Sequence, residues 1–180
     1  MKRRATLALM GQVGLASWAS VATLGLAGCG FKLRGSQIFT FNSIAIMPSP
    51  GGPLAAELRR SFGKSVQVLP NDVPVAQAQV IVDILQELRE KIVVGTNSSG
   101  QVRELQLRIR LKFRVRTPQG KELLGETEIV QRRDLSFNES AVLAKDAEEA
   151  LLYRDMQSDL VQQLLRRLSA LSYAASAKPT

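Results

Sequence analysis

The stretch that decides the fold is Leu105-Gln-Leu-Arg-Ile-Arg-Leu-Lys-Phe-Arg-Val-Arg116. Apolar side chains fill every second position, and polar or basic side chains fill the positions between them. Successive side chains of a β-strand point to opposite faces, so this pattern predicts a long strand with one face on a core. The other face meets water or a partner. The basic positions of that face are Arg108, Arg110, Lys112, Arg114 and Arg116.

The segments on either side of this strand predict its neighbours in a sheet. Thr96 to Gly100 is rich in turn residues, and so is Thr117 to Gly120. Beyond the second turn, Leu123 to Leu135 is predicted to return as a less regular strand. Gln79 to Val94 is ambiguous, because its apolar residues fit both a period of two and a helix. We interpret it as a strand, since a turn connects it directly to the clear strand.

Further elements complete an α+β pattern. Phe41 to Met47 and Val66 to Leu69 are short β-favouring runs. Between them, Pro53 and Gly63 mark the start and end of a short helix. Asn138 to Leu171 is predicted to be a long helix with one apolar stripe. The expected fold is a single α+β domain over residues 41–171, a two-layer sandwich with a small mixed sheet of about four strands covered on one face by two helices. Residues 172–180 are expected to be a flexible tail.

The start of the chain is typical of an exported protein. Lys2, Arg3 and Arg4 precede an uncharged run from Ala5 to Ala27, the pattern of a secretory signal peptide over residues 1–28. An uncleaved transmembrane anchor is the alternative, since the run is just long enough to span a bilayer. Leu26-Ala27-Gly28-Cys29 resembles the lipobox of bacterial lipoproteins, which implies that Cys29 becomes a lipidated N-terminus joined to the domain by a linker over 29–40. A buried, unmodified cysteine is the competing interpretation.

The amino-acid composition argues against catalysis and metal binding. The formal net charge is +8, and there is one cysteine and no histidine. The commonest general base near neutral pH is therefore missing, and no disulfide or metal cluster can be built around one cysteine. We expect no enzyme activity, no metal and no cofactor. The basic row on the long strand is either a solvated face or a surface for an anionic ligand. Nucleic acid is not expected, because an exported protein does not meet it and no aromatic residues accompany the cations.

Two further motifs carry a resemblance to the LptE family of lipopolysaccharide (LPS) assembly lipoproteins. The predicted mature start, Cys29-Gly-Phe-Lys-Leu-Arg-Gly35, is similar to that of the family. Leu143-Ala-Lys-Asp146, at the head of the long helix, is similar to the family's Ala-Leu-Ala-Lys-Asp, with Val142 as a mild departure. The resemblance implicates Lys145 in LPS contact, whereas an ordinary surface lysine paired with Glu148 or Glu149 is the alternative.

The resemblance implies a location and a role. Gly30, rather than aspartate, follows the lipobox cysteine, which by resemblance to enterobacterial lipoproteins permits transfer to the outer membrane. The chain is then expected to plug and help assemble an LptD-type outer-membrane β-barrel, to bind LPS and to aid its delivery to the outer leaflet. The alternative is an envelope scaffold lipoprotein that binds neither LPS nor a barrel.

Overall fold

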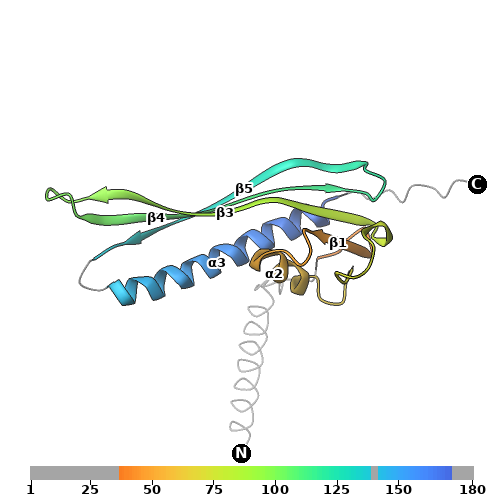
Figure 1. Ribbon diagram of the computed structural model, residues 1–180, viewed down its shortest axis with the longest axis horizontal. Helices are drawn as coiled ribbons and strands as arrows, with labels where there is room; N and C mark the ends of the chain where they lie inside the picture. The colour runs from red at the N-terminus through yellow and green to blue at the C-terminus, as the bar shows by residue number, and fades with distance from the viewer. Residues whose placement is uncertain (1–36, 139–141, 172–180) are drawn as a thin grey trace, which may run out of the picture. The chain divides into compact units, whose positions relative to one another are not determined.

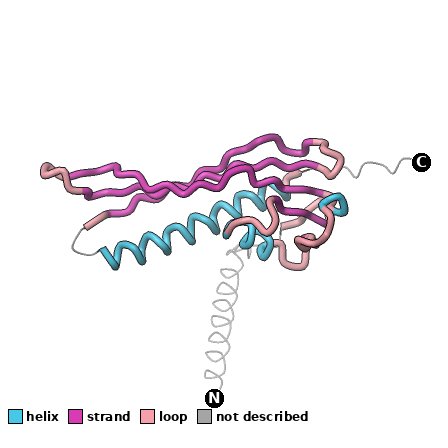
Figure 2. Tube along the Cα trace, in the orientation of Figure 1, coloured by secondary structure: helices cyan, strands magenta, loops and turns pink. Residues whose placement is uncertain are grey.

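The computed structural model describes residues 37–138 and 142–171, which form a layer of strands and a layer of helices (Figures 1 and 2). In chain order, the first elements are strand β1 (Ser43–Met47), helix α2 (Pro53–Ser61), strand β2 (Gln67–Val68) and a 3-10 turn (Val75–Gln77). They are followed by strands β3 (Val80–Thr96), β4 (Val102–Arg116) and β5 (Glu122–Ser136), and by helix α3 (Val142–Ser169). The predicted order of strand, helix, several strands and long helix is confirmed, and so is the α+β class.

The sheet has five strands in the order β2-β1-β3-β4-β5. The prediction of about four strands was one short, because the two residues of β2 pair with β1 at the sheet edge. β1 is parallel to both of its neighbours, whereas β3, β4 and β5 form an antiparallel meander. The ambiguous segment is a strand, β3, that pairs with β4 along almost its whole length. Long-range pairing decides here over the helical propensity of its middle part.

The alternation of apolar and polar residues along β4 identifies the face of the sheet that is buried in the core. The six apolar side chains from Leu105 to Val115 are buried, and the positions between them are partly or fully exposed. The buried face belongs to one core that both helices share. α2, which packs on α3 and β1, contributes Leu54 and Leu58, one turn apart. α3, which packs on β4 and β5, contributes one apolar stripe: Met156, Leu160, Val161, Leu164, Leu165 and Leu168.

The second half of α3 supplies all of its fully buried residues, while Leu152 and Tyr153 before it pack partly buried against the same core. Every buried residue of the helix lies at Met156 or beyond it, and the first fourteen residues expose most of their side chains. Figure 1 shows α3 running along the sheet, with its first turns toward the β3–β4 turn and its last turns toward β1. We call these two sides the hairpin end and the β1 end. The sequence predicts a helix start at Asn138 and an N-cap at Ser140, but residues 139–141 lie outside the described part.

The first described residues pack at the β1 end. The Phe39 ring lies 5.3 Å from that of Phe62, which follows α2, and 5.4 Å from that of Phe41. The Thr40 hydroxyl donates a hydrogen bond of 2.8 Å to the carbonyl of Leu171, just after α3. The start of the described chain and the C-terminal ends of both helices therefore meet at one end of the sheet. The predicted signal peptide, Cys29 and the tail over 172–180 lie outside the described residues.

Candidate ligand surface

The sheet face turned away from the helices carries the basic row. Its five cations come from alternate positions of β4, the central strand of the meander, so they are held in line by the ladders to β3 and β5. β3 and β5 also bring carboxylates to this face, from Asp83, Glu90, Glu126 and Glu128. The row therefore lies between two acidic borders that the β4 sequence alone does not reveal.

Every cation of the row has a carboxylate neighbour. The Glu90 carboxylate lies 3.6 Å from the Arg108 guanidinium and 3.2 Å from that of Arg110. Glu128 lies 3.9 Å from Arg110, on its other side. The Lys112 ammonium lies 3.7 Å from Glu126. The contact between Lys112 and Glu126 is long and both partners are more than a third exposed, so it contributes little to stability.

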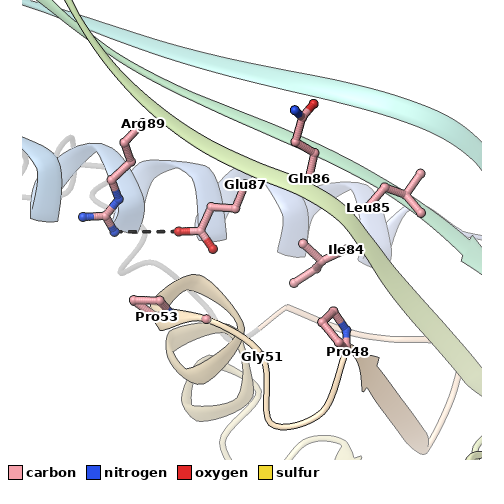
Figure 3. A pocket seen from close by; sticks show the side chains of 9 residues that line it. Pro48, Gly51, Pro53, Ile84, Leu85, Gln86, Glu87 and Arg89 are labelled. Atoms are coloured by element: carbon pink, nitrogen blue, oxygen red, sulfur yellow. Dashed lines mark ion pairs between the residues drawn. The ribbon is translucent and has the colours of Figure 1, made fainter.

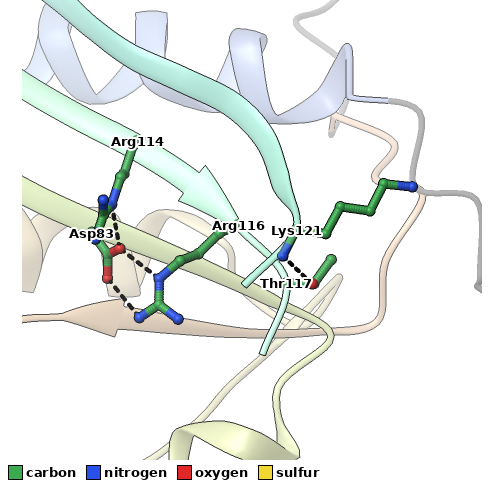
Figure 4. A network of polar contacts seen from close by, with 5 residues as sticks. All are labelled: Asp83, Arg114, Arg116, Thr117 and Lys121. Carbon is green, nitrogen blue, oxygen red and sulfur yellow. Dashed lines mark hydrogen bonds and ion pairs between the residues drawn. The ribbon is translucent and has the colours of Figure 1, made fainter. Parts of the chain in front are cut away.

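Asp83 holds the end of the row much more firmly. Its carboxylate accepts hydrogen bonds of 2.7 and 3.2 Å from Arg116 and one of 2.9 Å from Arg114 (Figure 4). Burial raises the pKa of Asp83, but the two guanidinium groups more than offset this and hold it below its ordinary value. The same contact raises the pKa of Arg116. Arg114 and Arg116 are thus part of the sheet's own structure, whereas Arg108, Arg110 and Lys112 keep looser partners.

Arg132 is a further cation of this face that the sequence analysis missed. It lies on β5 directly opposite Arg108, it is exposed, and it makes no ion pair with any described residue. Like charges directly opposite each other destabilise a sheet unless an anion lies between them. The irregular apolar pattern of β5 concealed its register, and only the pairing with β4 places Arg132 beside the row.

Lys145 lies on the other layer of the molecule. Its ammonium group donates to Ser136 at the end of β5, over 3.1 Å, and to Glu148 one turn further along α3, over 2.8 Å. The structure therefore shows Lys145 paired with Glu148, as in the alternative interpretation. The Lys145 side chain is 19% exposed. Lys145 therefore belongs to the helix layer, whereas the basic row belongs to β4.

A cleft of about 480 Å³ lies where the loop between β1 and α2 faces β3 (Figure 3). Its floor carries Glu87, whose pKa burial raises, and the Arg89 guanidinium 3.7 Å away opposes that rise. Arg89 also lies over the Tyr153 ring and donates to Gln157. Gln157 and Ser158 in turn donate to Glu57 of α2. This polar chain ties β3 to both helices, which is a structural role.

The described residues offer no other chemical centre. Among them, no three side chains of His, Cys, Asp or Glu are placed to hold a metal ion. None of the described helices is both long enough and apolar enough to cross a membrane.

Exposed apolar side chains gather at the hairpin end. Val93 and Val94 lie near the end of β3, and Val142, Leu143 and Leu151 belong to the first turns of α3. Leu143 and Leu151 share one helix face, eight residues apart, and they are 87% and 57% exposed. We call these five residues the hairpin-end apolar surface.

Comparison with known proteins places the chain among proteins of LPS assembly. A family model described as LptE, lipopolysaccharide-assembly, matches residues 37–168. The chain is 30% identical over 167 residues to the LPS-assembly lipoprotein LptE of Photorhabdus laumondii, covering 88% of this chain and 86% of that one. It is 29% identical over 161 residues to the protein of the same name from Pectobacterium atrosepticum, with the same coverage of 88% and 86%.

Two solved structures of other proteins have a fold similar to that of this chain. The solution structure of an uncharacterized lipoprotein B from Nitrosomonas europaea superposes with a TM-score of 0.67 at 36% identity, covering 78% of this chain and 91% of that one. The rare lipoprotein B of Shewanella oneidensis, at 23% identity, has a TM-score of 0.59 and covers 72% of this chain and 95% of that one. The second likeness concerns the fold alone.

Proposed function

Because the chain belongs to the LptE family of lipopolysaccharide-assembly lipoproteins, we propose that it works at the outer membrane as a non-catalytic partner of an LptD-type β-barrel. In this proposal Cys29 carries the lipid anchor. The folded domain plugs the barrel and helps it to assemble. The chain also binds LPS and aids its delivery to the outer leaflet.

The observation that carries the barrel contact is the hairpin-end apolar surface. The segments that carry the five side chains, near the end of β3 and in the first turns of α3, lie at the end of the domain opposite to the start of the described chain. In the first half of α3, Leu152 and Tyr153 pack partly buried against the core, whereas Leu143 and Leu151 are exposed and contribute little to the stability of the domain. A partner that covers this end would gain the free energy of removing them from water.

The proposed LPS contacts fall into two groups that the structure ranks differently. Lys145 keeps one exposed carboxylate partner, Glu148, that an incoming phosphate can replace. On the open sheet face, the ion pairs of Arg108, Arg110 and Lys112 range from 3.2 to 3.9 Å, and Arg132 has none among the described residues. Guanidinium groups bind phosphate in a bidentate way, so the space between Arg108 and Arg132 is a favourable place for an LPS phosphate. Arg114 and Arg116 are the least available, because Asp83 holds them by hydrogen bonds.

Co-purification tests the barrel contact. Full-length chain carrying Leu143→Asp and Leu151→Asp should lose most of the β-barrel that the parent chain retains after detergent extraction. The matched control carries Ile38→Asp and Val75→Asp, two exposed apolar residues outside that surface, and should retain the barrel. Equal recovery with both variants would reject this contact surface, and absence of a barrel from the parent preparation would favour the scaffold alternative.

A further inference from the structure

The side chains of the open sheet face stand in rows across the strands, because the pairings of β3, β4 and β5 place one residue of each strand beside the others. One row holds Glu90, Arg108 and Arg132. The next row toward the β1 end holds Leu88, Arg110 and Val130. Neighbouring rows on one face are about 6.5–7 Å apart and neighbouring strands about 4.8 Å apart. These six side chains therefore form one patch, which we call the central patch.

Positive charge is in excess on the β5 side of the central patch. Arg108 and Arg132 are directly opposite each other, and Arg132 makes no ion pair with any described residue. The Glu90 carboxylate lies on the β3 side of Arg108, 3.6 Å from its guanidinium. The Nε atom of Arg108 is buried and has no hydrogen-bond partner among the described residues. Like charges opposite each other destabilise a sheet, so an anion between the two guanidinium groups would relieve this repulsion.

Two apolar side chains border the guanidinium groups. Leu88 and Val130 lie on either side of Arg110 and are 38% and 37% exposed. An inorganic phosphate has no apolar group, so it would gain nothing from these neighbours. An acyl chain attached to a sugar phosphate would leave water as it packs on them. The central patch therefore fits a phosphate that belongs to a lipid.

The row on the other side of the guanidinium pair offers partners for hydroxyl groups. It contains Gln106 of β4 and Asp134 of β5. The amide of Gln106 donates a hydrogen bond of 3.0 Å to the Asp134 carboxylate, which holds that side chain in place. A carboxylate has about four acceptor positions, so Asp134 can also accept hydrogen bonds from the hydroxyl groups of a sugar beside the phosphate.

We propose that the central patch binds lipid A, the phosphorylated and acylated sugar of LPS, with one phosphate between Arg108 and Arg132 and one acyl chain across Val130 and Leu88. The proposal rests on the LPS binding proposed above and names the part of LPS that this face takes. The central patch contains no residue of the hairpin-end apolar surface, so a bound lipid leaves that surface to the barrel.

Binding of LPS fragments to the full-length chain in detergent tests the phosphate contact. Arg132→Gln should weaken the binding of phosphorylated lipid A about tenfold, because a charge-assisted contact is lost. The same variant should bind dephosphorylated lipid A as the parent chain does. The matched control is Arg133→Gln at the next position of β5, where the guanidinium contacts Asp159 of α3 over 2.8 Å. This control should bind both lipids as the parent does. Without lipid, Arg132→Gln should melt no lower than the parent, since it removes a like-charge pair.

A second pair of variants tests the acyl contact. Leu88→Thr with Val130→Thr should weaken the binding of phosphorylated lipid A several-fold, because less apolar surface leaves water. It should leave unchanged the binding of the same phosphorylated sugar without its acyl chains. The matched control is Leu85→Thr with Val75→Thr, at apolar residues that are 44% and 37% exposed outside the central patch. It should bind phosphorylated lipid A as the parent does.

The outcomes separate this proposal from the LPS binding on which it rests. Equal losses with Arg132→Gln and Arg133→Gln would overturn the phosphate site, and equal losses with the two threonine variants would overturn the acyl contact. If Arg132→Gln weakens the binding of phosphorylated core oligosaccharide but not that of lipid A, the central patch takes a core phosphate and the proposal is wrong. If Lys145→Asp weakens lipid A binding and Arg132→Gln does not, this proposal fails alone. A parent chain that binds no LPS fragment overturns both.

Discussion

Asp83 shows how one residue changes the meaning of a sequence pattern. On the sequence alone, Arg114 and Arg116 are two members of an apparent anion-binding row. In the fold, β3 places the Asp83 carboxylate between them, where three hydrogen bonds neutralise it. The pair of arginines is therefore a structural clamp between β3 and β4, and its charge is not available to a ligand unless Asp83 is protonated or removed.

The clamp makes a prediction about stability and its pH dependence. Asp83→Asn should lower the free energy of unfolding by about 1.5–3 kcal/mol near pH 7, because charge-assisted hydrogen bonds are lost. The pKa of Asp83 is depressed in the fold, so its contribution is present above the ordinary aspartate pKa of about 3.9 and is lost as the pH falls through the lower folded value. Urea unfolding at neutral and acid pH should show the two proteins converging at acid pH.

Glu126→Gln is the control for this measurement. Its pair with Lys112 is 3.7 Å long and its side chain is 61% exposed, so the free energy of unfolding should change by less than about 1 kcal/mol. An Asp83→Asn variant as stable as this control at neutral pH would contradict the assignment of the clamp.

At the scale of the elements, β4 determines which residues form the core and which face outward. Ile109→Asp places a charge in the middle of the buried face, where the wild-type side chain is 1% exposed. It should cost about 4 kcal/mol or more, or prevent folding, because a buried ionised group without a partner is strongly unfavourable. Arg110→Gln, at the next position, removes ion pairs of 3.2 and 3.9 Å at a side chain that is 38% exposed and should cost less than about 1 kcal/mol. Thermal melts that rank the two variants the other way round would mean that the register of β4 is wrong.

The elements also show what the sequence can and cannot predict. The alternation of β4 and the apolar stripe of α3 are local patterns, so their secondary structure and buried faces follow from the sequence. The pairing of β2 with β1 rests on two residues and has no local signal. The partners of the basic row depend on the registers of β3 and β5, each with irregularities in its pairing with β4. Counting residues along β3 and β5 therefore could not place Glu90 beside Arg108 or Arg132 opposite it.

At the scale of the whole molecule, the hairpin end and the open sheet face differ in chemistry. The hairpin end carries exposed apolar side chains. The middle of the open sheet face carries cations that are mostly matched by carboxylates. The hairpin end therefore suits the barrel contact that we propose, and the open sheet face suits the proposed LPS contacts.

The most direct test of this account measures LPS in the outer leaflet of cells depleted of the chain. Depletion should lower the LPS that reaches the cell surface, and the wild-type chain should restore it. Lys145→Asp should restore it less well than the wild-type chain, because the change replaces a proposed phosphate contact by a carboxylate. If surface LPS is unchanged after depletion, the chain does not take part in LPS delivery and the central claim is wrong.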